Sequence, residues 1–361
     1  MDMLREIETR NLPPIMAEGM TADGWPERRA DLVELLAREE YGVSPPPPAQ
    51  VRVEAVSEDS TAWAGKAIHR EVRLSFPTPN GEFSFSAHFV LPRAGRPLPL
   101  FVHISFYPYP GGEYMPMEEI ADSGWAVAMF CYNDVTEDRD DGFASGLAGM
   151  FPRNGGGSDW GKIAMWAWAA SRVLDAALNM DEVDCRRIVA LGHSRLGKTA
   201  LWAAAQDERF AAAVSNESGC SGAAVSRGKQ GETVQRITTV FPYWFCQNYV
   251  RCGGREDELP FDQHQLLASI APRPVYVASA EQDLWADPAS EFLGCVAASQ
   301  ACELLGLRGL VHCGRMAEPG ELYHDGRIGY HVRPGTHFLS RQDWRLFMDY
   351  LHRHLPPASR A

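Results

Sequence analysis

The chain has 361 residues, of which 45% are hydrophobic and 22% charged, a composition typical of a soluble globular enzyme with a large core. Its formal net charge is -13 and its lysines and arginines form no cluster, so binding to nucleic acid is not expected. No apolar run reaches the roughly 18 residues needed to span a bilayer, and the eight cysteines include no CxxC pair, so neither a membrane protein nor a zinc site is indicated.

The first 48 residues are predicted to form a helical lead-in and a linker that pack on a single catalytic domain over 49–361. One amphipathic helix is expected over about 25–40. The prolines at 45–48 predict an extended linker, because proline cannot continue a helix. Residues 1–6 lack the apolar core of a secretory signal, which favours a cytoplasmic protein, although a secreted chain trimmed at its N-terminus would have the same sequence.

Three β-rich runs follow the linker, at 51–56, 67–76 and 83–91. The residues Pro79, Asn80 and Gly81 between the last two runs are a strong turn signal. Together they predict an antiparallel meander at the start of the catalytic domain.

From residue 98 onward the strand-like runs are continuously apolar, as expected of strands buried on both faces. Strands are predicted at 98–105, 125–130, 188–191, 211–215, 275–280 and 329–332, and helices at 159–178, 199–206 and 341–354. Ser340 and Asp343 form a capping-box-like start for the last helix. The alternation predicts an α/β fold of the α/β hydrolase type, a three-layer αβα sandwich whose mostly parallel central sheet follows the antiparallel strands.

The most informative stretch is 191–198, which connects a predicted strand to an Ala-rich helix and places Ser194 between Gly192 and Gly197. A strand, a Gly-flanked serine and a helix in this order are typical of a nucleophile elbow. The sharp turn lifts the hydroxyl off the sheet and aims the next backbone N–H at the same point. The usual second glycine lies two residues after the serine, whereas Gly197 lies three residues after it. Ser194 is the predicted nucleophile.

His337 is the best placed general base, because its turn-rich loop lies between the last predicted strand and the last helix. The order serine, acid, histidine places the base there in α/β hydrolases. His324 and His331 are weaker candidates, since His331 is expected to point sideways from its strand. The ring of His193 is expected to point away from the Ser194 hydroxyl.

Two carboxylates are candidates for the acid, each at the end of a predicted strand. Glu217 follows the strand after the elbow helix, and Asp283 follows the next strand, where a standard α/β hydrolase keeps its acid. A carboxylate at either place can orient the imidazole and stabilise its charged form. Both candidates stay open.

Arg195 and Lys198 are unusual neighbours for a nucleophile. Lys198 lies one helical turn past Ser194, so both can face the pocket mouth. Cations at a helix N-terminus oppose the helix dipole, which favours a functional role over a solvated surface. They suggest an anionic or highly hydroxylated substrate, or direct help for the oxyanion.

The chain resembles the glucuronoyl esterase family, carbohydrate esterase family 15. The family signature Gly-x-Ser-Arg-x-Gly-Lys is matched by Gly192, Ser194, Arg195, Gly197 and Lys198, and His193 stands before the serine as in bacterial-type members. The resemblance implies an α/β hydrolase fold and a Ser-His-acid triad that uses no metal or cofactor. It also implies cleavage of the ester between the 4-O-methyl-glucuronic acid of xylan and lignin alcohols.

By this resemblance Ser194 is the nucleophile, His337 the base, and Glu217 or Asp283 the acid. Arg195 stabilises the oxyanion through its backbone N–H and its guanidinium. The resemblance further implies that the hydroxyls of the uronate sugar are held by Lys198, Glu232 and Trp285. The loop 105–112 departs from the Gly-Asn-His type sequence of the family, so the substrate specificity stays open.

The leading hypothesis is a serine carboxylic ester hydrolase that acts on glucuronoxylan-derived carbohydrate esters through an acyl-enzyme. An acetylxylan esterase or a promiscuous carboxylesterase on the same scaffold is the second hypothesis. A carbohydrate-binding homologue that has lost turnover is the third. The leaving alcohol and the oligomeric state stay open at this point.

Overall fold

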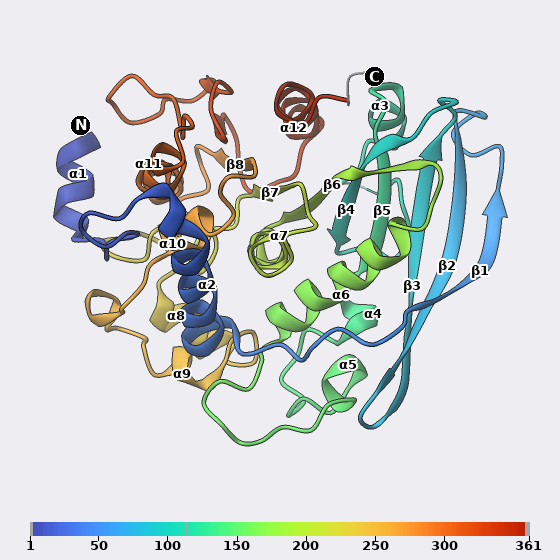
Figure 1. The fold of residues 1–361 in the computed structure, drawn as a ribbon, viewed down its shortest axis with the longest axis horizontal. Helices are drawn as coiled ribbons and strands as arrows, with labels where there is room; N and C mark the ends of the chain where they lie inside the picture. The colour runs from blue at the N-terminus through green and yellow to red at the C-terminus, as the bar shows by residue number, and fades with distance from the viewer. Residues whose placement is uncertain (1–2, 113, 358–361) are drawn as a thin grey trace.

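The computed structural model describes residues 3–112 and 114–357, which form a ten-stranded sheet with helices on both faces (Figure 1). The strand order is β1-β2-β3-β5-β4-β6-β7-β8-β10-β9. The strands are β1 (Arg52–Asp59), β2 (Ala67–Thr78), β3 (Gly81–Pro92), β4 (Leu98–Ser105), β5 (Ala126–Cys131), β6 (Val183–His193), β7 (Ala212–Asn216), β8 (Val275–Ala280), β9 (Leu322–Tyr323) and β10 (Ile328–Arg333).

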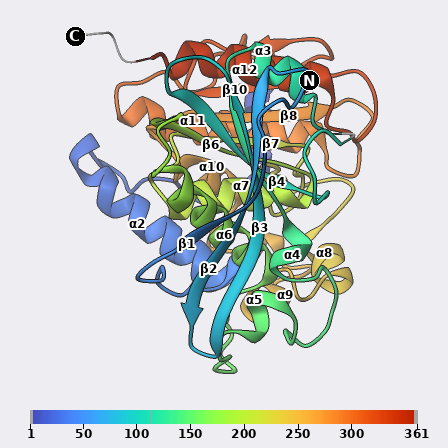
Figure 2. The same cartoon turned by 90° about the vertical axis from the view of Figure 1, so that its right-hand side faces the viewer.

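The predicted change from antiparallel to parallel strands is confirmed. β1, β2, β3 and β5 pair antiparallel in that order, and they lie at the edge of the sheet that faces the viewer in Figure 2. From β5 to β4, β6, β7, β8 and β10 every pairing is parallel, and the short β9 closes the far edge antiparallel. The turn between β2 and β3 closes at the Thr78–Gly81 pair, as the Pro-Asn-Gly sequence predicts.

Helices cover both faces of the sheet. They are α1 (Met3–Arg10), α2 (Trp25–Leu36), α3 (Met117–Asp122), α4 (Tyr132–Val135), α5 (Gly146–Gly149), α6 (Lys162–Ala177), α7 (Arg195–Gln206), α8 (Val234–Val240), α9 (Gln247–Val250), α10 (Gln263–Ala268), α11 (Pro288–Leu304) and α12 (Arg341–His354). Among the residues described, none of these helices is both long and apolar enough to cross a lipid bilayer.

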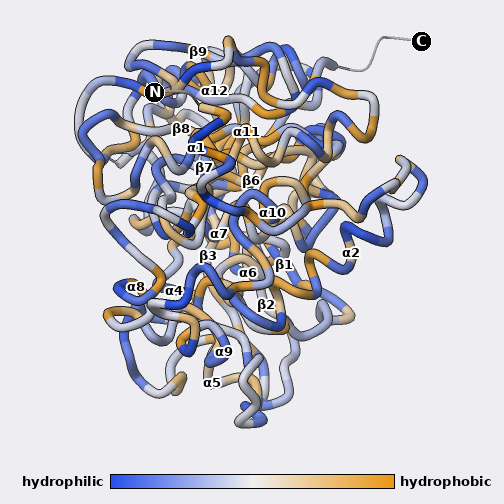
Figure 3. Tube along the Cα trace, turned by 90° about the vertical axis from the view of Figure 1, so that its left-hand side faces the viewer, coloured by the Kyte–Doolittle hydropathy of each residue, from blue (hydrophilic) through white to orange (hydrophobic). Residues whose placement is uncertain are grey.

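Alternate residues of β4 belong to two separate cores, which is the direct sign of three layers. Leu100, Val102 and Ile104 pack in a large core with α2, α6, α7, α10 and α11. Phe101 packs in a smaller core with α3 and α12, where its ring stacks on Trp125 at 4.3 Å. Side chains alternate across a strand, so β4 is buried on both faces. Figure 3 shows hydrophobic residues gathered around β6 and β7 at the centre, with mainly hydrophilic outer loops.

The helix α11 is not predicted by the sequence analysis, although it has 17 residues. Its residues are buried on most sides, so the sequence lacks the polar face that makes an amphipathic helix visible. The last helix begins with the predicted capping box, in which the Ser340 side chain accepts from Asp343 N and the Asp343 side chain accepts from Ser340 N.

The N-terminal segment packs on later parts of the chain through α2 and the wide helical turn at Ala37–Tyr41 that extends it. The Tyr41 ring stacks on Trp202 of α7 at 4.5 Å, and its hydroxyl donates to the Ser221 carbonyl at 2.9 Å. The indole N–H of Trp25 donates to the Ala271 carbonyl. These contacts connect residues that lie more than 150 positions apart in the sequence, and they place α2 and Tyr41 in the same hydrophobic core as α7.

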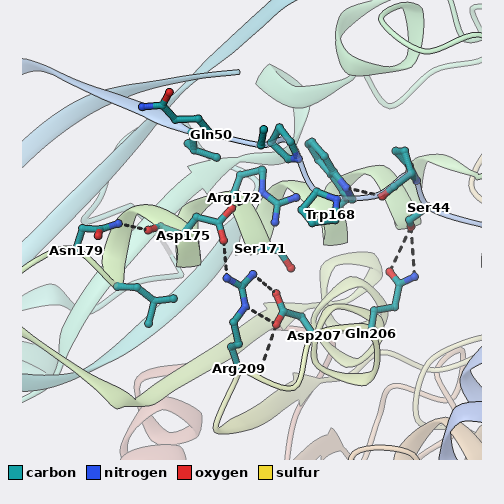
Figure 4. A pocket seen from close by; sticks show the side chains of 16 residues that line it. Ser44, Gln50, Trp168, Ser171, Arg172, Asp175, Asn179, Gln206, Asp207 and Arg209 are labelled. Carbon is teal, nitrogen blue, oxygen red and sulfur yellow. Dashed lines mark hydrogen bonds and ion pairs between the residues drawn. The ribbon is translucent and has the colours of Figure 1, made fainter. Parts of the chain in front are cut away.

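The proline linker crosses α6 and the C-terminal end of α7, where it borders a cavity of about 940 Å³ (Figure 4). The Trp168 indole donates to the Pro45 carbonyl at 3.1 Å. Arg209 donates to both Asp175 and Asp207 at 2.7 Å, so the charges at this cavity pair with one another. The cavity lies at the end of α7 opposite to Ser194 and lacks the expected catalytic residues.

Candidate active site

Ser194 is the single residue between β6, which ends at His193, and α7, which begins at Arg195. Its backbone has φ 58° and ψ -128°, a region that costs a residue with a Cβ about 1–3 kcal/mol. The turn is held by the Ser194 N–H, which donates to the Asn216 carbonyl at 2.8 Å. This is the geometry of a nucleophile elbow.

The two glycines of the motif allow the turn to pack closely. A Cβ on Gly192 would lie 2.0 Å from the Leu196 carbonyl oxygen. A Cβ on Gly197 would lie 3.1 Å from the Ser215 Oγ of β7. The displaced second glycine is therefore located where α7 meets the neighbouring strand. The N–H groups at the start of α7, including that of Arg195, have no acceptor within the helix and can donate to an oxyanion.

His337 faces both predicted carboxylates at once. Its Nδ1 lies 2.6 Å from Asp283 Oδ2 and 3.1 Å from Glu217 Oε2. Asp283 follows β8, and Glu217 follows β7 with a left-handed φ of 49°. Both acid candidates therefore reach the same imidazole nitrogen, with Asp283 the closer of the two.

Glu217 has further partners that the sequence analysis does not predict. Its Oε1 accepts from Arg333 Nη2 at 2.6 Å, and its Oε2 accepts from the Phe338 N–H at 2.8 Å. Arg333 ends β10 and also donates to Asp343 through Nε at 3.0 Å. In the sequence Arg333 is followed directly by Pro334 and Gly335, and this context resembles that of any surface arginine.

Charges set the protonation of the site. Burial acts to lower the pKa of His337, but its hydrogen bonds to Asp283 and Glu217 raise this pKa to about 9. Burial acts to raise the pKa of Asp283, yet the hydrogen bond from His337 lowers it overall. Burial raises the pKa of Glu217, against the opposing effects of His337 and Arg333. Asp283 is thus the carboxylate that most readily stays ionised beside the imidazole.

The other histidines have different partners. His331 and His324 both contact the hydroxyl of Tyr276, at 2.9 Å and 2.7 Å, and His331 also bonds to Asp343. His193 lies against the proposed base, because its ring centroid is 4.5 Å from that of His337. Burial and the charge of His337 lower the pKa of His193 to about 3, so it stays neutral.

Three of these residues have ligand atoms within 4.8 Å of one another: His193, Glu217 and His337. Two histidines and a carboxylate are a ligand set that suits zinc. Here both Glu217 oxygens already accept hydrogen bonds, one of them from the Arg333 cation. A metal ion would also compete with the proton that His337 holds tightly. These contacts disfavour a metal ion and favour an acid–base site.

A cavity of about 360 Å³ connects the catalytic candidates with the predicted sugar-binding residues. Lys198 is 4% exposed, its ammonium donates to the Ser218 carbonyl, and its Nζ lies 3.8 Å from Glu232 Oε2. Trp285 is 52% exposed at the rim. The cavity is lined by Ser194, Arg195, Lys198, Glu217, Ser218, Gly219, Glu232, Phe241, Trp244, Asp283, Trp285, Ala286 and His337.

The guanidinium of Arg195 has a partner that the sequence analysis does not predict. It forms an ion pair with Asp138, which also accepts from the Trp244 indole N–H at 2.6 Å and the Tyr132 hydroxyl at 3.2 Å. The guanidinium lies 4.8 Å from the centroid of the Trp244 ring. The Phe241 ring stacks on the Trp244 ring, with 3.9 Å between the centroids. Asp138 belongs to an acidic run at 137–141, which resembles a solvated surface segment in the sequence.

The packing of the elbow gives a direct test. We expect Gly192→Ala to destabilise the fold by about 1–3 kcal/mol, because its Cβ would overlap the Leu196 carbonyl. Urea unfolding measures the change. Gly156→Ala is the matched control, since its Cβ meets nothing within 4 Å. Equal stabilities of the two variants would contradict the close packing of the turn.

Comparisons with known proteins identify the family of the chain. The family model for the glucuronyl esterases of fungi matches residues 77–306. The carbohydrate esterase MZ0003 from an unknown prokaryotic organism is 42% identical over 247 residues, which are 66% of this chain and 56% of that protein. The chain therefore spans little more than half the length of that relative.

Solved structures extend the similarity to nearly the whole chain. A glucuronoyl esterase from Solibacter usitatus superposes with a TM-score of 0.89 at 34% identity, covering 96% of this chain and 98% of that one. A promiscuous family 15 carbohydrate esterase from a marine bacterial metagenome has a TM-score of 0.84 at 31% identity, covering 96% and 97%. The three-layer fold is the predicted α/β hydrolase fold. With its elbow motif and its family match, the chain belongs to the glucuronoyl esterase family.

Proposed function

We propose that the chain hydrolyses esters of glucuronic acid in carbohydrates derived from glucuronoxylan, through a serine acyl-enzyme. The observation that carries this proposal is the single cavity that Ser194 and His337 share with Lys198, Glu232 and Trp285. One end of the cavity holds groups for acyl transfer, and the other holds groups that suit a sugar. The Solibacter usitatus relative, named a glucuronoyl esterase, supports the same substrate class.

Acyl transfer begins when Ser194 Oγ attacks the ester carbonyl and His337 takes its proton. The oxyanion accepts from the Arg195 N–H at the start of α7. The tetrahedral intermediate collapses to the acyl-enzyme, and the alcohol leaves with the proton from His337. Water activated by the same imidazole then releases the uronic acid and restores Ser194.

The two carboxylates have different roles in this proposal. Asp283, at 2.6 Å from His337 Nδ1, orients the ring and balances the imidazolium. Glu217 is the second acceptor at 3.1 Å, and Arg333 holds it in place. A second carboxylate stabilises the charged ring further, and it also makes the neutral base less abundant at neutral pH.

The sugar end of the cavity is polar on one side and aromatic on the other. Lys198 and Glu232 offer a donor and an acceptor 3.8 Å apart, which suits vicinal hydroxyls. The half-exposed indole of Trp285 offers a flat face for a sugar ring. The guanidinium of Arg195 pairs with Asp138 and contacts the Trp244 ring, which lines the cavity. The backbone N–H of Arg195 is the group that donates to the oxyanion.

A broader esterase activity is the second candidate. The metagenomic relative at 31% identity is described as promiscuous, and the exposed rim at Trp285 leaves room for other acyl groups. An acetyl ester needs only Ser194, His337 and the oxyanion site, because it makes no use of the sugar groups.

Substrate preference and the serine separate these functions. We expect wild-type enzyme to hydrolyse benzyl glucuronate with a higher kcat/KM than 4-nitrophenyl acetate, and Ser194→Ala to lower kcat on both by roughly 10⁴-fold or more. Benzyl alcohol and nitrophenol release measure the rates. Activity confined to the acetate would favour the second candidate, and an unchanged rate in Ser194→Ala would contradict the acyl-enzyme.

The acid assignment is tested by two variants. We expect Asp283→Asn to lower kcat/KM by about 10²–10³-fold and Glu217→Gln by about tenfold, because the second carboxylate partly replaces the first. The double variant should approach the roughly 10⁴-fold loss seen when a triad acid is removed. A larger loss in Glu217→Gln, with an unchanged unfolding midpoint, would assign the acid to Glu217.

The pH dependence follows from the raised pKa of His337. Only the neutral imidazole accepts the Ser194 proton, so kcat/KM should rise with pH, reach half its maximum near pH 9, the pKa of His337, and level off above it. Asp283→Asn removes the main stabilising partner of the imidazolium, so the rising limb should shift to lower pH. A profile that is flat from pH 6 to 9 would contradict this electrostatic arrangement.

A further inference from the structure

Two loops contribute residues to the predicted sugar-binding part of the cavity, and they are joined by one half-buried lysine, Lys229. The first, here the Lys229 loop, spans residues 228–232 and carries Glu232. The second, here the Trp285 loop, spans 283–287 and carries Asp283 and Trp285. Glu232, Asp283 and Trp285 all line the cavity.

The ammonium of Lys229 is bonded to three backbone carbonyls. It donates to Gln230 at 2.8 Å, to Ala286 at 2.9 Å and to Trp285 at 3.1 Å. These bonds use all three of its donors. Partial burial lowers the pKa of Lys229, against the opposing effect of nearby carboxylates.

Further contacts align the two loops around this ammonium. The Glu232 N–H donates to the Trp285 carbonyl at 3.0 Å, and the Gln230 N–H donates to Asp287 Oδ2 at 2.9 Å. Gly231 has a φ of 68°, and a Cβ there would lie 2.4 Å from the Leu284 carbonyl oxygen. The loops are therefore in close backbone contact, with no room for a side chain between them.

Opposing effects act on the Lys229 ammonium, because desolvation disfavours its charge whereas the nearby carboxylates of Asp287, Glu291 and Glu232 favour it. Its ammonium contacts the carbonyl of Ala286, two residues before α11 begins at Pro288. A cation near a helix N-terminus faces the positive end of the helix dipole, and it loses hydration when it is buried. Asp287, the N-cap of α11, offsets part of this cost.

The indole of Trp285 depends on the backbone that carries it. The residue is 52% exposed, so packing of its own ring restricts it weakly. Its carbonyl accepts from both Lys229 Nζ and the Glu232 N–H. The backbones that carry the indole and the Glu232 carboxylate are therefore bonded through one oxygen atom. A shift of that carbonyl would move both groups relative to the sugar.

We propose that Lys229 is a positioning residue for sugar binding, which holds Trp285 and Glu232 at a fixed separation in the lining of the cavity. This inference rests on the proposed function, because it assigns those two groups to the sugar. Lys229 acts through the Trp285 carbonyl and takes no part in acyl transfer.

Kinetics with two esters test the proposal. We expect Lys229→Met to raise KM for benzyl glucuronate about tenfold, with kcat changed less than about threefold, because lost hydrogen bonds misplace the binding groups. The effect on kcat/KM for 4-nitrophenyl acetate should be much smaller, and Lys229→Arg should restore part of the loss. Lys66→Met, which removes an exposed lysine paired with Glu118 and Asp122, is the control for loss of a charge.

A double-variant cycle shows whether Lys229 acts through Trp285. In the Trp285→Ala background, we expect Lys229→Met to change KM less than it does in the wild type, since coupled residues are not additive. Full additivity, or equal losses on both esters, would overturn the positioning role.

Hydrogen exchange gives a readout that needs no activity. The Asp287 N–H donates to the Asp283 carbonyl and the Ala286 N–H to the Asp283 carboxylate, so both amides should exchange slowly. We expect Lys229→Met to speed exchange in peptides over 283–287, while Lys66→Met leaves it unchanged. Unchanged exchange in Lys229→Met would overturn the role of Lys229. Wild-type enzyme that leaves benzyl glucuronate intact would instead overturn the proposed function.

Discussion

The tight turn at Ser194 is the constraint on which the rest of the site depends. β6 lies between β4 and β7 at the centre of the sheet, and α7 is buried against it, so neither element can move to relieve the turn. One residue must change the chain direction, and Ser194 does so with a positive φ. The hydroxyl and the Arg195 N–H are therefore placed by core packing, which fixes them more firmly than a surface loop would.

A balance of charges places the base above this turn. Two carboxylates close to one imidazole would repel each other, and the buried Arg333 offsets Glu217 while Asp283 pairs with His337. Arg333 is in turn bound by Asp343, whose side chain also caps α12. The position of the His337 loop thus depends on the last strand and the last helix together. Loss of Arg333 would leave the buried carboxylates of Glu217 and Asp343 without the cation that they share.

Local patterns in the sequence predicted the parts of the protein that are defined by neighbouring residues. The meander, the parallel strands and the capped last helix follow from periodicity and turn residues, and the elbow at Ser194 follows from strand, glycines and helix in sequence. His337 follows from chain order. In contrast, α11 is buried on most sides and shows no polar face.

Residues whose roles come from distant partners could not be predicted in this way. Asp138 meets Arg195 from 57 positions away, and Arg333 meets Glu217 from 116 positions away. Each is an ordinary charged residue next to other polar residues in its own segment. Lys229 belongs to the same class, because its three acceptors include carbonyls from 56 and 57 positions along the chain. Backbone carbonyls leave no trace in a sequence.

The carboxylates that pair with Arg195 and Lys198 affect whether the cavity binds a neutral ester or a charged uronate more tightly. Arg195 is bound to Asp138, and Lys198 lies beside Glu232, so each positive charge has a carboxylate nearby. A site built to retain a free uronate would leave a cation available to its carboxylate. A neutral ester, in contrast, needs hydrogen bonds from the sugar end and an N–H for the oxyanion. In the proposed reaction the released uronate would find no uncompensated cation beside Ser194, because Asp283 pairs with His337 and Glu217 pairs with Arg333. The pairing of these cations with carboxylates therefore favours a neutral ester over a charged product.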